Sequence, residues 1–516
     1  MRQPSGSVPP PPPPPPPEPR RHLGSRGVKF AVALLAVALV AVSALAFVGL
    51  QRTGDLQDRL DEQERAQEEP ENPLDDLLDD LGVGGEPDDL LDDFGGGGDL
   101  LGGSNADLLE CLGSGSGGGL GDLFGEGSGS QDEGPRKLVT TISKQVEKVR
   151  ELRFEKPVDA EFLRKPQLEK RVGELFLQGY SRRDAALEAR VLAALGAIPR
   201  DTDLFETRKS ALEGQVSGFY VPSTEELVVL SGDEIGPLEK VTLAHELEHA
   251  LADQRLGLPL SERSDPETAD ADLATLAVVE GDATLTMQRW SLAHLSLSDQ
   301  LAMLSGSPGL QRSQAELEAM PHFIQQQLTF PYLDGLGFVC AIQSNGGWAA
   351  VDRAYDRPPP STDQVLFPER YDSKAKPVPT KPIGEPGGGW SNPLSGSFGA
   401  AELKWLFGAP GGDVTKALPD PLERAGAWGG GEFELWTDGG RSAVGVGLAQ
   451  RRSSDGLCES VTRWYAASFD DDRESVAGGA ALVAEGGAQD AVITCSGDDV
   501  KIGIGPSLAV ARSLTE

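Results

Sequence analysis

The sequence predicts a mainly helical α+β fold that begins only after a long N-terminal region unsuited to folding. Apolar residues recur at helical spacing from about residue 137 onward. A short hairpin interrupts the helices, and short strands mix with a helix in the C-terminal part. We therefore expect three segments: a helical domain at 137–371, a Gly/Pro-rich, poorly ordered linker at 372–393, and a small α+β subdomain at 394–516.

Residues 1–29 contain nine consecutive prolines, Pro9 to Pro17, and are expected to form a disordered cytoplasmic tail. Phe30 to Leu50 follows without a charged residue and is long enough to cross a bilayer as a single transmembrane helix. Basic residues precede this segment and acidic residues follow it, which predicts a cytoplasmic N-terminus and an extracytoplasmic body at the cell membrane. A cleaved signal peptide is the alternative, because Ala44-Leu45-Ala46 resembles a cleavage site.

Residues 51–136 are expected to form a disordered, acidic, Gly-rich linker. Between residues 53 and 134 there are 24 acidic and 2 basic residues, a net charge of −22 out of −35 for the whole chain. Repulsion between like charges and the high glycine content keep such a segment extended and prevent it from burying a core. The acidity also argues against nucleic acid as a partner.

Helical patterns and turn residues divide the rest of the chain. Residues 137–198 read as helices separated by prolines, and 216–221 with 227–230 read as a β-hairpin. Two further helices are expected in the helical domain, and the subdomain should mix short strands with one helix. The ranges for these elements are helices 317–328 and 336–355, a proline-rich loop 358–371, strands 433–436, 443–449, 491–495 and 499–504, and a helix near 460–469.

The candidate functional motif is Ala244-His245-Glu246-Leu247-Glu248-His249-Ala250. On a helix, residues four apart lie on one face, so both imidazoles can bind a single metal ion, for which zinc is the expected cofactor. Glu246 follows the first histidine and is placed to take a proton from a water activated by the metal. Two surface histidines on an ordinary helix are the alternative.

The third ligand is expected to be Glu280. A helix should start near Asp265-Pro266, and Glu280 then lies in the middle of its apolar stripe. A carboxylate buried in such a stripe needs a cation or a hydrogen-bonding partner, and zinc is such a cation. A salt-bridged or water-facing glutamate is the alternative, and His294 and His322 are weaker candidates for the ligand.

With these residues, the chain resembles the gluzincins, the thermolysin-type zinc peptidases in which two histidines and a glutamate bind zinc. The stretches GQVSGFYVPSTEELVVLSG, LAHELEHALADQ, VVEGDATL, PPPSTDQVLFPERY and RAGAWGGGEFELW resemble more closely a family of largely uncharacterised bacterial extracytoplasmic metallopeptidases. The resemblance implies a zincin-like catalytic domain at 137–371, with His245, His249 and Glu280 as zinc ligands and Glu246 as general base. Peptides or proteins would then be the substrates.

The sequence departs from the gluzincin pattern at the position four residues after the ligand glutamate, where Thr284 replaces an aspartate. Asp282 or Asp253 would have to orient a ligand histidine instead. The resemblance also implies a donor to the oxyanion, for which the candidates are Arg289, Tyr332, Tyr355 and Tyr371. A zinc-stabilised envelope binding module without turnover is the alternative function.

The four cysteines do not have the spacing of a zinc finger. Cys111 lies in the acidic linker and Cys340 in an expected helix, whereas Cys458 and Cys495 both lie in the C-terminal subdomain. An exported location permits a disulfide between Cys458 and Cys495. The sequence does not indicate an oligomeric state.

Overall fold

The computed structural model describes Cys111 and residues 134–232, 235–260, 268–304, 308–452, 456–469, 480–484 and 489–516. The expected cytoplasmic tail, the expected transmembrane helix at 30–50 and, apart from Cys111 and 134–136, the acidic linker lie outside these residues. Within the described ranges, every helix is too short or insufficiently apolar to cross a bilayer.

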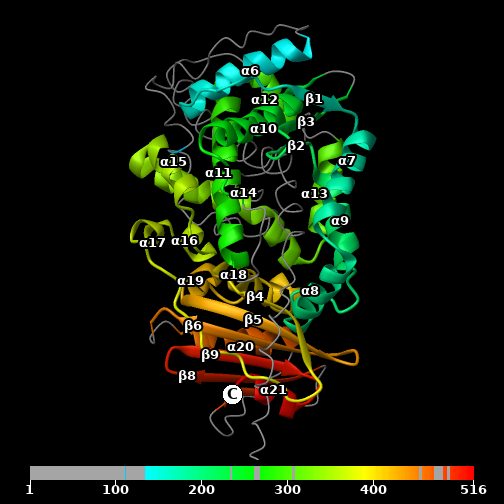
Figure 1. The fold of residues 1–516 in the computed structure, drawn as a ribbon, viewed down its shortest axis with the longest axis vertical. Coiled ribbons are helices and arrows are strands. Elements are labelled where there is room, and N and C mark those ends of the chain that lie inside the picture. The colour runs from blue at the N-terminus through cyan, green and yellow to red at the C-terminus, as the bar shows by residue number, and fades with distance from the viewer. Residues whose placement is uncertain are drawn as a thin grey trace, which may run out of the picture.

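A helical part carries the motif and forms the upper part of the molecule in Figure 1. The helices expected between residues 137 and 198 are present, and so is the hairpin, in which Gly218 pairs with Val229. The elements are α6 (Pro135–Arg150), β1 (Ala160–Leu163), α7 (Lys165–Gly179), α8 (Arg182–Ala194), α9 (Leu204–Gln215), β2 (Gly218–Val221), β3 (Glu226–Leu230), α10 (Pro237–Arg255), α11 (Ala269–His294), α12 (Leu297–Leu304), α13 (Pro308–Glu318), α14 (His322–Gly346), α15 (Trp348–Asp356), α16 (Thr362–Leu366) and α17 (Pro368–Asp372).

Two features of this part differ from expectation. Strand β1 joins the hairpin as a third strand, parallel to β3, in the order β1-β3-β2. Helix α14 runs unbroken through Pro331, whereas the sequence suggested separate helices at 317–328 and 336–355. A proline removes one helical hydrogen bond, and packing along α11 outweighs that loss here.

Helices α11 and α14 touch backbone to backbone. A methyl group built on Gly281 would lie 2.3 Å from the carbonyl oxygen of Gly335, and one on Gly335 would lie 2.4 Å from that of Ala277. Real Cβ atoms do not approach this closely, so both glycines are required for the contact. Because Gly281 follows Glu280 directly, this contact also sets the position of the candidate ligand.

The C-terminal part is an antiparallel six-stranded sheet in the order β4-β5-β6-β9-β8-β7, which lies below the helices in Figure 1. The α+β class is therefore correct, and the strands expected near 433–449 and 491–504 belong to this sheet. Its elements are β4 (Ser391–Ser397), α18 (Ala400–Gly408), η2 (Pro410–Gly412), η3 (Val414–Lys416), α19 (Pro421–Ala425), β5 (Trp428–Asp438), β6 (Arg441–Gln450), α20 (Leu457–Phe469), β7 (Ala480–Ala484), β8 (Asp490–Ser496), β9 (Asp499–Gly505) and α21 (Leu508–Leu514).

The segment 372–393 differs from the poorly ordered linker that we expected. The Val378 amide donates to the carbonyl of Gly429, and the Gly384 amide donates to that of Leu514. Ile383 is buried against the face of β6, where Gly445 leaves room for its side chain. Glycine and proline therefore allow close packing on the sheet here, rather than separating two independent bodies.

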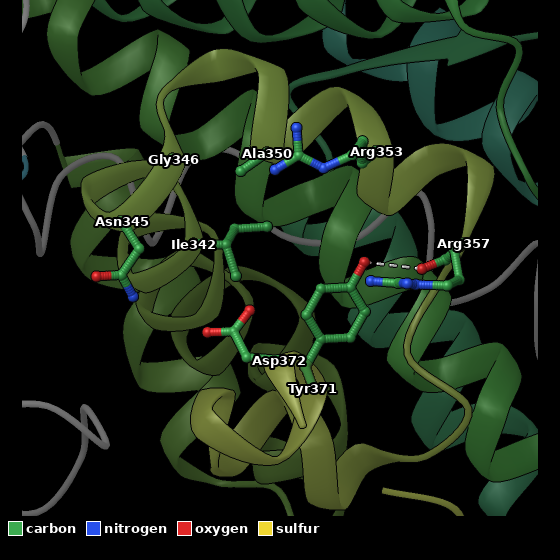
Figure 2. Close-up of a pocket in the computed structure, with 8 residues that line it drawn as sticks. All are labelled: Ile342, Asn345, Gly346, Ala350, Arg353, Arg357, Tyr371 and Asp372. Carbon is green, nitrogen blue, oxygen red and sulfur yellow. Dashed lines mark hydrogen bonds between the residues drawn. The ribbon is translucent and has the colours of Figure 1, made fainter. Parts of the chain in front are cut away.

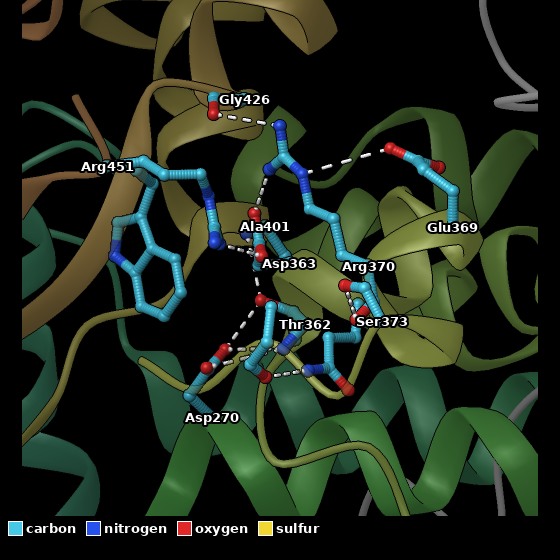
Figure 3. A network of polar contacts seen from close by, with 12 residues as sticks. Asp270, Thr362, Asp363, Glu369, Arg370, Ser373, Ala401, Gly426 and Arg451 are labelled. Atoms are coloured by element: carbon cyan, nitrogen blue, oxygen red, sulfur yellow. Dashed lines mark hydrogen bonds and ion pairs between the residues drawn. The ribbon is translucent and has the colours of Figure 1, made fainter. Parts of the chain in front are cut away.

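A buried polar network joins the start of α11 to the C-terminal part (Figure 3). Asp270 accepts hydrogen bonds from the backbone amide and the hydroxyl of Thr362, and that hydroxyl also accepts from the Ala401 amide. The neighbouring Asp363 pairs with Arg370 and with Arg451, which follows β6. A single apolar core continues from α7 through α14 to the strands, so the two parts pack as one unit.

Two disulfides link distant segments. Cys458 in α20 bonds to Cys495 in β8, the pairing that an exported location permits. Cys111 bonds to Cys340 in α14, with 5.7 Å between the Cα atoms. The sequence did not predict this second bond, and it ties the acidic linker to the helical part at Cys111. Spacing alone cannot reveal a pairing between residues 229 positions apart.

Candidate metal site

Helix α10 presents the motif from inside the core. Pro237 occupies its first turn, and the Glu239 carboxylate accepts from the backbone amide of Gly236, which caps the helix. Every residue from Val241 to Ala252 is buried, so the histidines cannot be surface residues. Their rings lie edge to face with centroids 4.6 Å apart, as expected for residues one helical turn apart.

Glu280 on α11 meets both histidines. Its Oε2 atom lies 3.2 Å from Nε2 of His245 and 3.3 Å from Nε2 of His249. The three side chains each offer one ligand atom, and these atoms all lie within 4.8 Å of one another. The structure therefore brings together the three residues that the sequence singled out as ligands. No other group of three or more His, Cys, Asp or Glu residues in the described part of the chain is arranged to hold a metal ion.

The chemistry of this group suits a divalent cation. The Nδ1 atoms of both histidines are buried without a hydrogen bond among the described residues, while both Nε2 atoms face the same carboxylate oxygen. Four buried carboxylates gather at or next to the group, opposed by the buried guanidinium of Arg150. They belong to Glu246, Glu248, Glu280 and Asp282. A cation would offset this excess of negative charge, which is costly inside a protein.

The pKa values show how strongly the groups interact in the metal-free chain. Burial lowers the pKa of His245 to about 4, so this imidazole is neutral and ready to act as a ligand. Burial also acts to lower the pKa of His249, but the charge of Glu280 and its hydrogen bond outweigh burial and raise it to about 10. Burial would raise the pKa of Glu280, but the charge of His249 and hydrogen bonds from both histidines lower it.

Glu246 lies beside the edge strand β2. A methyl group built on Gly218 would come within 3.2 Å of the Glu246 Cγ atom and 2.7 Å of the Thr242 Cγ2 atom, so glycine lets the strand approach the helix closely. Burial raises the pKa of Glu246 to about 8; the charge of His249 opposes this rise, and that of Glu280 adds to it. A bound cation would lower this pKa and leave the carboxylate able to accept a proton.

A second layer of charged groups behind the histidines was not foreseen from the sequence. The Arg150 Nε atom donates to both oxygens of Asp282, at 2.9 and 3.0 Å, and the Tyr355 hydroxyl donates to Asp282 at 3.0 Å. Glu248 is fully buried, with one oxygen 3.7 Å from the Nδ1 atom of His249. The expectation that Asp282 or Asp253 orients a ligand histidine is therefore wrong: Asp253 instead accepts a hydrogen bond from Tyr220. The sequence signal that could have indicated this second layer was Glu248, a glutamate within the buried helix α10.

The candidate oxyanion donors lie in different places. The Tyr332 ring stacks at 6.3 Å from the His245 ring, which makes Tyr332 the candidate beside a ligand. Tyr355 is bonded to Asp282, the Tyr371 hydroxyl donates to the carbonyl of Arg357, and Arg289 donates to the carbonyl of Cys111 and to Gln343.

His294 and His322 do not join the metal group. His294 lies at the C-terminal end of α11 with its ring 5.9 Å from that of Trp290, and His322 is the first residue of α14. Burial lowers the pKa of both imidazoles. The weaker alternatives for the third ligand therefore lose support.

A surface pocket of about 290 Å³ lies away from the metal group (Figure 2). It is formed by the C-terminal end of α14 together with α15 and α17, and its lining includes Arg353, Tyr371 and Asp372 but none of the four motif-related residues. None of the candidate metal ligands lines this pocket.

Comparisons with known proteins do not assign this chain to a family. No protein-family model matches the sequence, and no curated protein matches it. A structure search finds a likeness to the "Crystal structure of a putative hydrolase with a novel fold from Chloroflexus aurantiacus", with 12% sequence identity and a TM-score of 0.29. The likeness covers 52% of this chain and 97% of that chain. At this level of similarity, it supports no conclusion about fold or activity.

Proposed function

We propose that the protein is a zinc-dependent peptidase of the gluzincin type. The observation that carries the proposal is the convergence of His245 and His249 on one oxygen of Glu280, with Glu246 adjacent on the same helix. Two histidines and one carboxylate are a common ligand set of catalytic zinc, which keeps a further position for water or substrate.

A zinc ion held by these three residues would supply Lewis-acid chemistry at the reacting carbonyl. Glu246 would accept a proton from the attacking water and later pass it to the leaving amine. Strand β2 is at one edge of the sheet and pairs with β3 among the described strands. An extended peptide could pair with its other edge and bring a scissile bond beside Glu246.

An inactive zinc-stabilised binding module is the second candidate, and the burial of the site favours it. His245, Glu246 and Glu280 are at most 2% exposed, and His249 is 7% exposed. A substrate would therefore reach the metal only after some movement of the surrounding chain, whereas a structural ion needs no access. Measured turnover separates the two candidates.

The proposed location is outside the cytoplasm, with the segment 30–50 as a membrane anchor. The two disulfides support an exported body, because such bonds persist in oxidising compartments. Alkylation of thiols in intact cells, with and without a reductant, tests this location.

The deciding experiment compares wild type with Glu246→Gln, using a library of peptides and unstructured proteins. Wild type should hydrolyse some of them, a chelator should stop the reaction, and added zinc should restore it. Glu246→Gln should keep its zinc but lose at least about 10²–10⁴-fold in rate, the usual contribution of a general base. Glu239→Gln, at the start of the same helix, is the matched control and should keep full activity. Wild-type rates in Glu246→Gln would exclude the mechanism.

A further inference from the structure

Arg150 is a buried charge that reaches the metal group from a distant part of the chain. It is the last residue of α6, and its side chain is fully buried between α10, α11 and α15. Its guanidinium bonds to Asp282 through Nε and to Asp352 through Nη2 at 2.6 Å, and it lies 4.5 Å above the ring of Trp348. These contacts hold the guanidinium in one orientation.

Glu248 lies between this guanidinium and a ligand histidine. Its Oε1 atom is 4.0 Å from the Arg150 Nε atom, and its Oε2 atom is 3.7 Å from the His249 Nδ1 atom. Both oxygens of Glu248 are buried and lack a hydrogen bond in the described structure, and the same is true of the His249 Nδ1 atom. A shift of less than about 1 Å would bring Glu248 within hydrogen-bond distance of His249.

We propose that Arg150 is a positioning residue of the metal centre, holding the Glu248 carboxylate against the Nδ1 atom of His249. With Nδ1–H donating to Glu248, the Nε2 atom of His249 is free of its proton and faces Glu280 and the metal. A carboxylate in this position fixes the tautomer and orientation of a ligand histidine. The inference rests on the proposed metal site and extends it to α6, whose last residue, Arg150, precedes His249 by 99 positions.

The charge balance explains why an arginine is needed at this place. Glu248 and Asp282 face each other inside the protein, and two adjacent buried carboxylates repel unless a cation lies between them or beside them. Arg150 contacts Asp282 directly and approaches Glu248, so it neutralises part of this repulsion. Without the guanidinium, Glu248 would turn away from Asp282, and its carboxylate would lose its place beside the Nδ1 atom of His249.

The chain offers a matched control. Arg208 in α9 is also buried, bonds to a carboxylate (Glu188) and to a tyrosine (Tyr180), and lies over the ring of that tyrosine. It belongs to the core around α7, α8 and α9, and its hydrogen-bond partners there, Tyr180, Glu188 and Gln327, lie outside the metal site. Arg208→Met therefore reproduces the loss of a buried arginine without touching the metal centre.

The test measures the zinc dissociation constant of the full chain by competition with a chromophoric chelator, and the absorption spectrum after Co²⁺ substitution. Arg150→Met and Glu248→Gln should each weaken zinc binding by about 10- to 100-fold, as loss of an outer-shell partner does. The double variant should be no weaker than the worse single one, because both act on the same contact. The two single variants, Arg150→Met and Glu248→Gln, should also alter the Co²⁺ spectrum. The zinc dissociation constant of Arg208→Met should stay within about twofold of the wild-type value.

The outcomes separate this inference from the proposed function. If wild type and Glu280→Ala bind zinc equally poorly, the metal site itself is wrong. If wild type binds tightly and Glu280→Ala does not, but Arg150→Met matches Arg208→Met, the positioning role is overturned and the metal site stands. Multiplicative losses in the double variant would show that Arg150 does not act through Glu248. If Arg150→Met does not fold, Glu248→Gln and Arg150→Lys decide, and Arg150→Lys should bind zinc less tightly because lysine lacks the planar fork.

Discussion

The protein contains two buried arginine networks built from the same chemical groups, one behind the metal group and one in the core of α7, α8 and α9. Around Arg208, two nitrogens bond to both oxygens of Glu188, and Gln327 and the Tyr180 hydroxyl complete the set. Around Arg150, the Nη1 atom and both oxygens of Glu248 are buried without a hydrogen bond among the described residues. The first network is complete in itself, whereas the second has more carboxylates than cations.

This difference separates a structural role from a functional one. A buried charge pair with all hydrogen bonds satisfied holds a core in one arrangement and needs nothing more. A buried cluster with surplus negative charge and orphaned imidazole nitrogens is costly in itself, and a bound cation removes much of that cost. The contrast between the two networks therefore favours a bound metal ion at the histidine–glutamate group beside the Arg150 network.

The largest effect should come from replacing one glutamate at each place by alanine: the candidate ligand Glu280 beside the Arg150 network, and Glu188 in the Arg208 network. Glu280→Ala should lower zinc affinity by on the order of 100-fold or more while leaving the fold largely intact, because a first ligand is lost. Glu188→Ala should leave zinc content unchanged and lower the free energy of unfolding by about 3 kcal/mol, because Arg208 would stay buried without its partner. Metal analysis and denaturant unfolding measure both. Equal zinc content in the two variants would remove the contrast.

Helix packing next to Glu280 should have the next largest effect. Gly335→Ala would place a methyl group against the carbonyl of Ala277 and push α14 away from α11. This change should lower the free energy of unfolding by about 3 kcal/mol and should also weaken zinc binding. Gly337→Ala is the control in the same helix: nothing lies within 4 Å of a methyl group there, so it should gain about 0.5–1 kcal/mol. Similar stabilities for the two variants would argue against the close α11–α14 contact.

The metal group should show a pH dependence that the Arg208 network lacks. The pKa of His249 is raised to about 10, so at neutral pH a metal ion must displace its proton. The apparent zinc affinity should therefore rise by at least about tenfold for each pH unit between pH 6 and 8, because binding releases the His249 proton and also the proton of Glu246, whose pKa burial raises to about 8. Calorimetry in buffers of different ionisation enthalpy measures this release. Arg208→Met should give the same slope, and a pH-independent affinity would contradict the ligand role of His249.

The smallest effect concerns the polar network at the other end of α11. Burial raises the pKa of Asp270 to about 7, although the hydrogen bonds from Thr362 oppose the rise. The folded state therefore holds a proton that the unfolded state releases, so this contribution to stability is complete below the unfolded pKa and is lost as pH rises through about 7. The free energy of unfolding should fall by about 1.4 kcal/mol between pH 6 and 8. Asp270→Asn should flatten the plot of unfolding free energy against pH in this range. An unchanged slope would show that Asp270 does not cause the pH dependence.

Local rules were enough to locate the helices α6, α7, α8, α10 and α11 and to propose the ligands. The spacing of His245 and His249 places both on one face of any helix, and the apolar stripe around Glu280 indicated a buried carboxylate that needs compensation. The hairpin β2–β3 followed from two short apolar runs that flank the turn segment 222–226. Each of these inferences depends on residues that are neighbours in the sequence.

The tertiary structure decided what depends on distant segments. It brought α6 behind α10 so that Arg150 reaches Glu248, paired Cys111 with Cys340, added β1 as a parallel strand, and folded residues 378–384 onto the sheet. No local pattern encodes these contacts, because each depends on how whole helices and strands pack together. The sequence by itself thus determined the ligands that one helix and one apolar stripe can show, whereas the second layer of charges came from the packing of α6, α10 and α11.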